Sequence, residues 1–421
     1  MAKTKTIEAQ IQKNPSSPEV TDLLNNIKSL VGTDDSRIVG TLEPKPGRWK
    51  ADEVISSGSL QIDLAVGIGG IPRGKVIEIY GQESCGKSTI SQLIMANAQR
   101  QGLLGLYIDS EHALDPTYAA TLGIDLKNMT VFRPENLEQA LDLIIGLCKG
   151  GFDGLIVLDS IPNTLPKKMM DAEAGEEGRR AAAATVYTRM MPVIKKQISD
   201  SNATLFMVNQ TRSTMATQPW EKKEDTPGGK MLKYTYDLRL EVRKSLDSGE
   251  RRSDEGTTFA EISVQCTKNK FGAPYKSGHF ILRDSIGIDP FEDAVNAALR
   301  PDVGLIFSDW KIEDDGVLTE KKNWFLWLLS DEDGEAIYNA TLEVDEDGEA
   351  MPNKLISQVD ILNEDSGEVK TRWVIRAYNR NPFMNLLEEY QEVLTPILRE
   401  GVLNTLAKDE DDEEDAENTE D

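Results

Sequence analysis

Cysteines and long apolar runs are both scarce in this chain of 421 residues. The three cysteines, Cys85, Cys148 and Cys266, do not make a disulfide framework of the kind found in small secreted domains. No apolar stretch reaches the ~18 residues that indicate a membrane-spanning helix, so we expect no membrane span. Residues 1–14 also lack the apolar core of a signal peptide. Together these absences favour a cytoplasmic protein.

Basic residues are sparse in the last part of the chain. Residues 301–421 contain 10 Lys and Arg against 33 Asp and Glu, whereas residues 1–300 contain 37 against 39. The net charge of −25 therefore belongs to the C-terminal region, and it does not exclude nucleic-acid binding by the rest. The acid-rich end, Asp409 to Asp421, predicts a disordered tail. Its role is either solubility or competition with DNA phosphates for the protein's own basic surface.

The most informative segment is GQESCGKS, from Gly81 to Ser88, which directly follows the apolar run 76–80. A strand, a glycine-rich loop and a helix in this order form the phosphate-binding motif called Walker A. Its backbone N–H groups surround phosphates, Lys87 reaches the β- and γ-phosphates, and the Ser88 hydroxyl ligates Mg²⁺. We expect nucleotide contacts from Gly81, Gln82, Glu83, Ser84, Cys85, Gly86, Lys87, Ser88 and Thr89. The segment thus predicts binding of a nucleoside triphosphate with Mg²⁺.

Polar residues at the ends of three other apolar runs extend this site. Asp159 ends the run 154–159, where it would hold the water shell of Mg²⁺. Glu111 follows the run 106–109, and a carboxylate there polarises the water that attacks the γ-phosphate. A surface glutamate remains an alternative interpretation of Glu111. Gln210 follows the run 204–209, the fifth expected strand, and places there a neutral amide that can sense the γ-phosphate.

The segment after Gln210, residues 211–230, shows little periodicity and mixes basic, apolar and glycine residues. Such a loop suits contact with a nucleic-acid backbone combined with insertion between bases. An ordinary surface loop is the alternative. The candidate DNA-binding residues are Arg212, Met215, Trp220, Gly228 and Gly229, with Trp220 as the inserting side chain.

Apolar runs that alternate with amphipathic segments predict an α/β fold with a mostly parallel, buried sheet. The expected strands are 76–80, 103–109, 129–133, 154–159 and 204–209, and the expected helices are 87–101, 116–122, 137–149 and 180–199. Three later segments, 236–244, 257–268 and 279–283, alternate apolar and polar residues and predict antiparallel strands appended to that sheet.

The composition changes along the chain and predicts its division into domains. Residues 1–50 form a leader, a helix over 19–31 and a linker, and residues 51–288 form the ATPase and DNA-binding core. Residues 289–408 form an acidic, small α+β domain, whose last elements are helices over 383–398 and 402–407, and 409–421 is the acidic tail.

An ordered set of segments carries a family resemblance. It comprises Ser56–Leu60, Gly69–Gly74, GQESCGKST, YIDSEHALDPTYAATLGID over 107–125, the strand end VLDS, Asn209-Gln210, Gly228-Gly229, Lys268-Asn269-Lys270 and Ala273-Pro274. Together they strongly resemble the bacterial RecA recombinases over about residues 19 to 290. The divergent, enlarged C-terminal region on this core suggests a phage-type relative as a hypothesis.

The resemblance implies a RecA-like P-loop ATPase that uses ATP with Mg²⁺. It would form helical homo-oligomeric filaments on single-stranded DNA, pair them with duplex DNA and catalyse strand exchange in recombination and repair, with accessory loading proteins left open. By position, Glu111 resembles the water-activating carboxylate, and Asp115 and Tyr118 the contacts on the adenine side. Lys268 and Lys270 resemble lysines that reach the neighbouring protomer's ATP, and Gln210 the γ-phosphate sensor.

The resemblance also assigns surfaces. The helix over 19–31 would dock on the adjacent protomer. The first DNA loop would be residues 168–180, in which Arg179 and Arg180 contact phosphates.

Two other classes of protein share parts of this pattern. One is a RecA-fold ATPase of another kind, such as a hexameric helicase or a clock-type kinase. The other is a regulator that binds ATP and a protein partner without catalysis. The segment from Tyr107 and the lysines 268 and 270 favour the recombinase over the first, and the intact hydrolytic set of Lys87, Ser88, Asp159 and Glu111 argues against the second.

Overall fold

The computed structural model describes residues 49–169, 176–213, 224–245, 251–252, 258–284, 286–308, 312–314, 317–319, 324–327, 331–341, 343–344, 350–351, 356–362, 369–377 and 380–407. The helix expected over 19–31 and the tail expected over 409–421 lie outside these ranges. No helix in the described ranges combines the length and apolar character that crossing a lipid bilayer requires.

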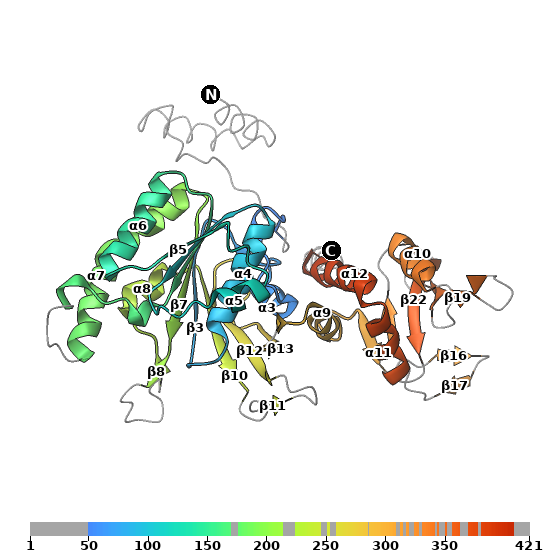
Figure 1. The fold of residues 1–421 in the computed structure, drawn as a ribbon. Helices are drawn as coiled ribbons and strands as arrows, with labels where there is room; N and C mark the ends of the chain where they lie inside the picture. Colours follow the sequence, from blue (N-terminus) through green and yellow to red (C-terminus); the bar gives the residue numbers. More distant parts are fainter. Residues whose placement is uncertain are drawn as a thin grey trace, which may run out of the picture. The chain divides into compact units, whose positions relative to one another are not determined.

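The largest sheet has ten strands, and most of its path is parallel (Figure 1). The order is β14-β13-β12-β10-β3-β7-β6-β4-β5, with β11 paired to β12. Its strands are β3 (Val76–Gly81), β4 (Leu104–Asp109), β5 (Met129–Phe132), β6 (Gly154–Asp159), β7 (Thr204–Gln210), β10 (Leu238–Lys244), β11 (Arg251–Arg252), β12 (Thr258–Asn269), β13 (Ser277–Arg283) and β14 (Gly287–Ile288). The predicted α/β fold with a mostly parallel sheet is confirmed.

Helices cover both faces of this sheet, as Figure 1 shows. They are α3 (Leu60–Val66), α4 (Lys87–Arg100), α5 (Pro116–Thr121), α6 (Leu137–Lys149), α7 (Glu176–Asp200) and α8 (Gly229–Thr235), with short 3-10 turns at Ile161–Asn163 and Lys167–Met169. The N-cap side chain of Asn136 accepts a hydrogen bond from the Gln139 N–H at 2.9 Å and begins α6. Gly86, with φ 88°, is the residue before α4 and turns the chain from the phosphate loop into that helix.

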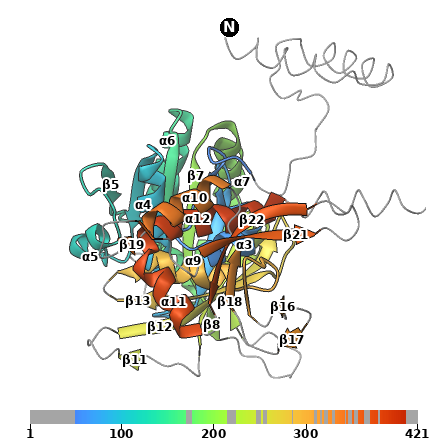
Figure 2. The same cartoon turned by 90° about the vertical axis from the view of Figure 1, so that its right-hand side faces the viewer.

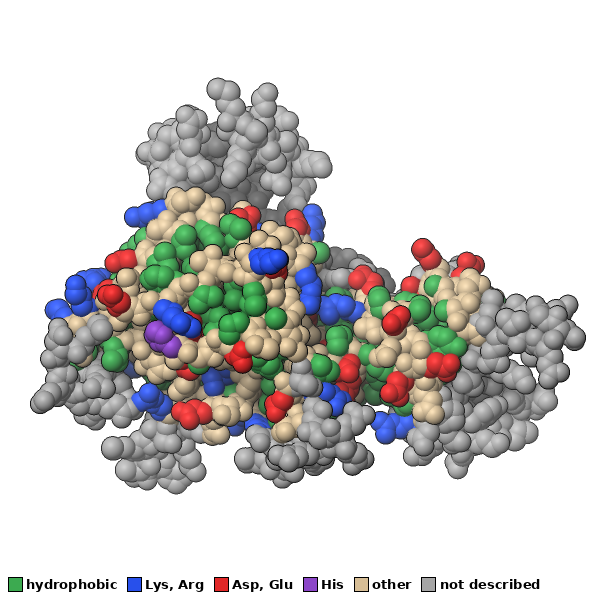
Figure 3. All heavy atoms as spheres, in the orientation of Figure 1, with side chains coloured by type: hydrophobic (Ala, Val, Ile, Leu, Met, Phe, Trp, Pro, Cys, Tyr) green, Lys and Arg blue, Asp and Glu red, His purple; other side chains and the backbone are tan. Residues whose placement is uncertain are grey.

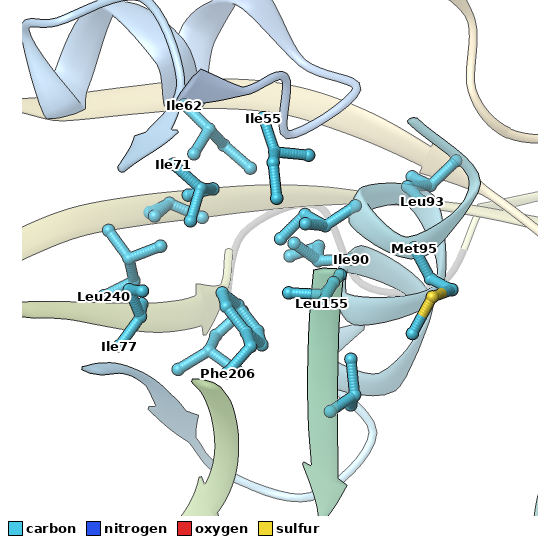
Figure 4. Packing of buried hydrophobic residues seen from close by; sticks show 14 of the residues in the cluster. Ile55, Ile62, Ile71, Ile77, Ile90, Leu93, Met95, Leu155, Phe206 and Leu240 are labelled. Atoms are coloured by element: carbon cyan, nitrogen blue, oxygen red, sulfur yellow. The ribbon is translucent and has the colours of Figure 1, made fainter. Parts of the chain in front are cut away.

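Alternate residues of the central strands enter two different cores. Ile77, Ile79 and Phe206 pack with α3 and α4 on one face, where Figure 4 shows Ile77, Leu240, Phe206 and Ile90 in one cluster. Val76, Leu205 and Met207 pack with α6 and α7 on the other. Because both faces are covered, the strands read as continuous apolar runs rather than as alternating ones.

One of the strands expected to be antiparallel, β10, is antiparallel to β12 but parallel to β3 on its other side. β10 pairs with β3 in parallel register, from Leu238 opposite Ile77 to Val242 opposite Gly81, whereas β12 and β13 are antiparallel as predicted. The chain reaches β10 from β7 through α8, and a helical crossover returns the chain in the same direction. An alternating pattern marks a half-covered strand and says nothing about its direction, which explains the error.

The C-terminal part has a smaller sheet and four helices. The four-stranded antiparallel sheet has the order β15 (Ile306–Ser308), β18 (Trp324–Trp327), β22 (Val369–Ala377) and β21 (Ile356–Leu362). The helices are α9 (Pro290–Ala298), α10 (Asp331–Ala340), α11 (Arg380–Glu389) and α12 (Gln391–Asn404), followed by a 3-10 turn at Thr405–Ala407. Figure 2 shows β21 and β22 beside one another, and Figure 3 shows acidic side chains over the visible face of this part.

The C-terminal core also includes residues of the ATPase region. Leu60 and Leu64 of α3 pack in the same cluster as Phe383 and Leu398. The carboxylate of Asp293 in α9 accepts hydrogen bonds from the Ser59 hydroxyl at 2.8 Å and the Leu60 N–H at 2.5 Å. Burial raises the pKa of Asp293 to about 7.

The last two helices divide at a different residue from the expected one. The sequence places the break between 398 and 402, but α11 ends at Glu389 and α12 continues through Gly401 to Asn404. Tyr390, with φ −107° and ψ 25°, is the residue that separates them. Gly401 is buried within α12, and the helix continues through it, so this glycine does not end the helix.

Four short antiparallel pairs complete the described structure. They are β1 (Val54–Ile55) with β2 (Ile71–Pro72), β8 (Arg212–Ser213) with β9 (Glu224–Asp225), β16 (Ile312–Asp314) with β17 (Val317–Thr319), and β19 (Glu343–Val344) with β20 (Ala350–Met351).

Candidate nucleotide site and nucleic-acid interface

The candidate site lies where the parallel strands β3, β4, β6 and β7 end. The phosphate loop follows β3, Glu111 follows β4, Asp159 ends β6 and Gln210 ends β7. The strand register places Gly81 opposite Gln210 and Asp109 opposite Asp159. Carboxyl ends of parallel strands are where α/β sheets bind ligands, so the fold brings these separate predicted residues to one edge.

The phosphate loop holds Lys87 inward. Its side chain is 7% exposed, its ammonium donates to the Gln82 carbonyl, and it lies 3.7 Å from the Cys85 sulfur. Ser84 has φ 54° and Gly86 has φ 88°, so the loop turns sharply before α4 begins at Lys87. The N-terminus of α4 thus faces the loop and offers its dipole and free N–H groups to an anion.

Two glycines of the loop have no room for a side chain. A Cβ on Gly81 would lie 2.1 Å from the Val242 carbonyl oxygen, and one on Gly86 would lie 2.5 Å from a Leu282 methyl carbon. Residues of the neighbouring strands β10 and β13 therefore pack directly against the loop. The sequence predicts these glycines as phosphate contacts, and the structure adds that packing and positive φ also require glycine at Gly86.

Asp159 is suited to hold a metal-bound water. It is 7% exposed, and the Tyr107 hydroxyl donates to its Oδ2 at 2.6 Å. Its buried Oδ1 receives no hydrogen bond from the described residues. Burial raises the pKa of Asp159, while interactions with the hydroxyls of Tyr107 and Ser88 act in the opposite direction.

The oxygen atoms around Asp159 fit Mg²⁺ better than a metal ion whose ligands all come from protein side chains. Within the described ranges, no group of three or more His, Cys, Asp and Glu side chains is placed to hold a metal ion. Mg²⁺ typically takes one or two protein oxygens and completes its shell with phosphates and water. The Ser88 hydroxyl and the Oδ1 of Asp159 supply such oxygens beside the phosphate loop.

Glu111, which follows β4, contacts residues at the ends of the adjacent strand β6 and of β7, the strand beyond it. The Ser160 hydroxyl donates to its Oε1, and the Gln210 side-chain amide lies 3.4 Å from the same oxygen. Glu111 is exposed, so water can reach it. A surface position of this residue is therefore compatible with a role in catalysis, because the carboxylate is held beside the amide predicted to sense the γ-phosphate.

A buried network behind Gln210 was not predicted from the sequence. Glu78 of β3 is fully buried, where it accepts from the Asn209 amide at 2.7 Å and from the Arg239 guanidinium at 2.5 Å. Burial raises the pKa of Glu78, and Arg239 opposes this effect. The Asn209 amide oxygen in turn accepts from the Gln210 N–H at 2.9 Å. The sequence feature that could have indicated this network is Glu78, an acidic residue within the apolar run 76–80.

The same network ties together both ends of the second candidate DNA loop. The Asn209 amide donates to the Pro227 carbonyl at 3.1 Å, and Arg239 donates to the Thr226 hydroxyl at 3.2 Å. Gly228 and Gly229, with φ 100° and 80°, then turn the chain into α8. A change in the loop therefore reaches the backbone of Gln210 through Asn209.

The other predicted DNA residues fall in different settings. Arg212 is half-buried in β8. Met215 and Trp220 lie outside the described residues. Arg179 and Arg180 lie in the first turns of α7, which begins at Glu176, so the end of the expected first loop is helical.

The two residues predicted on the adenine side lie on α5. The Asp115 carboxylate accepts from the backbone N–H groups of Thr117 at 2.7 Å and Tyr118 at 3.4 Å, so it caps this helix. The Tyr118 hydroxyl lies 3.4 Å from that of Thr89, next to the phosphate loop. Tyr118 is thus beside the loop's helix, while the cap supplies a structural role for Asp115.

Lys268 and Lys270 lie far from this chain's own phosphate loop. Asn269 pairs with Leu238, which pairs with Ile77 near the start of β3, whereas the phosphate loop follows the end of β3 at Gly81. At ~3.3 Å per residue, the two ends of β3 are about 17 Å apart. Lys268 is level with Glu78, about 10 Å along the strand from Gly81, and Lys270 lies toward the start of β3, away from the loop that precedes Lys87.

Comparisons with known proteins agree on one family. The family model described as the RecA N-terminal domain matches residues 40–289. The chain is similar to Protein RecA of Ectopseudomonas oleovorans, with 34% identity over 66% of this chain and 79% of that protein. It is also similar to Protein RecA of Thermus aquaticus, at 37% identity over 60% and 73%, and of Aquifex aeolicus, at 36% over 58% and 70%.

Proposed function

Because this chain belongs to the RecA family, we propose that it is a recombinase that hydrolyses ATP when it is bound to single-stranded DNA. The observation that carries this proposal is the convergence of Lys87, Asp159, Glu111 and Gln210 at one edge of the sheet. The residues that would serve as phosphate cradle, metal-water acceptor, water-activating carboxylate and γ-phosphate sensor follow strand ends at this one edge. These are the parts that phosphoryl transfer to water requires.

Each residue has a separate task in the proposed reaction. Lys87 leaves the Gln82 carbonyl and binds the β- and γ-phosphates, and the N-terminus of α4 binds the remaining phosphate charge. Ser88 and Asp159 would hold Mg²⁺, which would supply positive charge beside the phosphates. Glu111 accepts a proton from the attacking water, and the Ser160 hydroxyl orients that carboxylate.

Gln210 connects the DNA-binding segment to the reaction. Its amide lies 3.4 Å from Glu111, and its backbone is held by Asn209, which also contacts Pro227 at the end of the loop. DNA that binds the loop would therefore reposition Gln210 against the γ-phosphate and against Glu111. This arrangement supports hydrolysis that depends on DNA.

The positions of Lys268 and Lys270 support a site shared between subunits. Along the strand direction Lys268 is level with Glu78, about 10 Å before Gly81, and Lys270 lies farther toward the start of β3, so both are farther from their own phosphate loop than a lysine side chain reaches. They would instead contact the ATP of the next protomer in a helical filament. Nucleotide binding and filament assembly are then linked, and the filament would pair its single strand with duplex DNA for strand exchange.

The first experiment is the ATPase rate with Mg²⁺ at low salt, with and without single-stranded DNA. We expect strong stimulation by the DNA, followed by filaments in electron micrographs. Lys87→Ala should abolish turnover, and Lys149→Ala, on the exposed last turn of α6, is the matched control and should not. A rate that is indifferent to DNA, or closed rings without DNA-dependent filaments, would refute the proposal.

A further inference from the structure

Asp237 lies at the junction of α8 and β10, where several lysines converge. Its side chain is 9% exposed. One carboxylate oxygen accepts from the Lys195 ammonium at 2.5 Å and from the Lys270 ammonium at 2.9 Å. The other accepts from the Val76 N–H at 3.3 Å. The carboxylate is thus fixed by the start of β3 and holds two lysines from different elements, α7 and the end of β12.

The backbone around Asp237 fixes the rest of the cluster. The Lys270 N–H donates to the Asp237 carbonyl at 3.2 Å. The Lys268 ammonium donates to the carbonyls of Lys233 at 3.0 Å and Tyr234 at 3.2 Å, in the last turn of α8. The Lys195 ammonium also donates to the Thr235 carbonyl at 2.7 Å. One short helix end and one carboxylate therefore hold three ammonium groups.

We propose that Asp237 is a positioning residue for the lysines that this subunit offers to the nucleotide of the neighbouring subunit. The inference rests on the proposed function, in which Lys268 and Lys270 act across the subunit boundary. Without Asp237, the ammonium groups would repel one another, and Lys270 would lose its only anionic partner among the described residues.

The ion pair with Asp237 holds the Lys270 ammonium in position and leaves it able to bind phosphate oxygens. An ammonium group has three donors, and one bond to Asp237 leaves two for phosphate oxygens. The Lys270 side chain is still 46% exposed, so its ammonium is accessible from solution. A lysine that is already immobilised also loses less rotamer freedom when it binds its ligand.

The electrostatic balance of the cluster depends on this carboxylate. Burial lowers the pKa of Lys268, and Lys270, Lys195 and Arg239 lower it further, while Asp237 raises it. Burial likewise lowers the pKa of Lys195, which Asp237 raises and Lys270 and Lys75 lower. Removal of the negative charge would therefore deprotonate these lysines at a lower pH.

The test is Asp237→Asn in the full-length chain, assayed for DNA-stimulated ATPase across pH. We expect kcat to fall by about ten- to a hundredfold, because a displacement of about 1 Å in a positioned group can cost about a hundredfold. The alkaline limb of the pH profile should shift to lower pH. Asp153→Asn is the matched control, because Asp153 is half exposed and pairs only with Arg73 among the described residues, and its rate and pH profile should equal those of the unmodified protein.

A mixing experiment separates positioning across subunits from a defect within one subunit. Asp237→Asn protomers keep their own phosphate loop and Glu111, whereas Glu111→Gln protomers keep their lysines. Equal mixtures should hydrolyse ATP faster than the sum of the two proteins alone. If Asp237→Asn does not fold, Asp237→Glu takes its place; it should lower kcat and leave the alkaline limb unchanged, because the negative charge remains.

The outcomes distinguish the two proposals. An unmodified protein without DNA-stimulated ATPase refutes the proposed function itself. A normal unmodified protein together with an Asp237→Asn variant of unchanged rate and unchanged alkaline limb overturns the positioning role. A defective variant that mixing does not restore also overturns it, because Asp237 would then act only within its own subunit.

Discussion

Replacement of Tyr107 by phenylalanine tests how the buried carboxylate of Asp159 is held. The Tyr107 hydroxyl donates to Asp159 at 2.6 Å, and both side chains are buried, at 1% and 7% exposure. A hydrogen bond to a charged group contributes about 1.5–3 kcal/mol. Tyr107→Phe leaves the ring and its packing in place. We therefore expect the free energy of unfolding to fall by about 2 kcal/mol in the absence of nucleotide.

The functional consequence should appear in the metal dependence. In the unmodified protein Tyr107 occupies Oδ2 of Asp159 and leaves Oδ1 available to a metal-bound water. Without this bond the carboxylate can rotate, so the Mg²⁺ concentration needed for half-maximal ATPase should rise several-fold while the rate at saturating Mg²⁺ changes less. Tyr80→Phe, which removes a hydroxyl that donates to the Thr267 hydroxyl at 2.9 Å on a buried side chain, is the comparison for a simple loss of a hydroxyl group.

Two measurements decide the matter. Thermal and denaturant unfolding without nucleotide give the stability, and an Mg²⁺ titration of the DNA-stimulated ATPase gives the metal dependence. An unchanged stability together with an unchanged Mg²⁺ midpoint would show that Tyr107 does not hold Asp159, and the metal assignment of Oδ1 would lose its structural support.

Three further predictions concern the water-activating carboxylate, the phosphate loop and the C-terminal junction. Glu111→Gln should keep ATP binding but lower hydrolysis by orders of magnitude, measured by single-turnover kinetics; retained hydrolysis would mean that another group activates the water. Gly86→Ala should lose stability and nucleotide binding together, because a Cβ would lie 2.5 Å from Leu282 at a residue with φ 88°, and calorimetry with ATP measures both. Asp293 has a pKa raised from 3.8 to about 7, so the folded state binds the extra proton and its stabilising effect is lost as pH rises toward 7. The stability of the unmodified protein relative to Asp293→Asn should accordingly fall by about 1.4 kcal/mol per pH unit between pH 5 and 7 at most, and a constant difference would contradict the raised pKa.

The sequence predicts the parts of this protein that depend on local pattern. The strands that end at Asp159 and Gln210 were placed to within a residue, because a buried parallel strand is a continuous apolar run with a polar end. The phosphate loop and the start of α4 follow from glycine spacing. The family resemblance drawn from these motifs is confirmed by the match over residues 40–289.

Other features depend on contacts between residues that are far apart in the chain. The direction of β10 is set by the crossover through α8, which the alternation within 236–244 does not contain. Glu78 acquires its role from Asn209 and Arg239, which are 131 and 161 positions away. Asp237 likewise meets Lys195 and Lys270 at separations of 42 and 33. No periodicity or motif marks such pairs.

The contact between Gln210 and Glu111 has a mechanical consequence. These residues extend from β7 and β4, and β6 lies between the two strands. Their 3.4 Å separation is near the outer limit of a hydrogen bond, so a slide of a few tenths of an ångström along the strands either forms the bond well or removes it. The hydrogen bond between Gln210 and Glu111 is therefore sensitive to sliding of β7 relative to β4. A displacement of the end of β7, next to the proposed DNA-binding loop, would therefore change the surroundings of the Glu111 carboxylate through the sheet, before any new contact with a nucleotide forms.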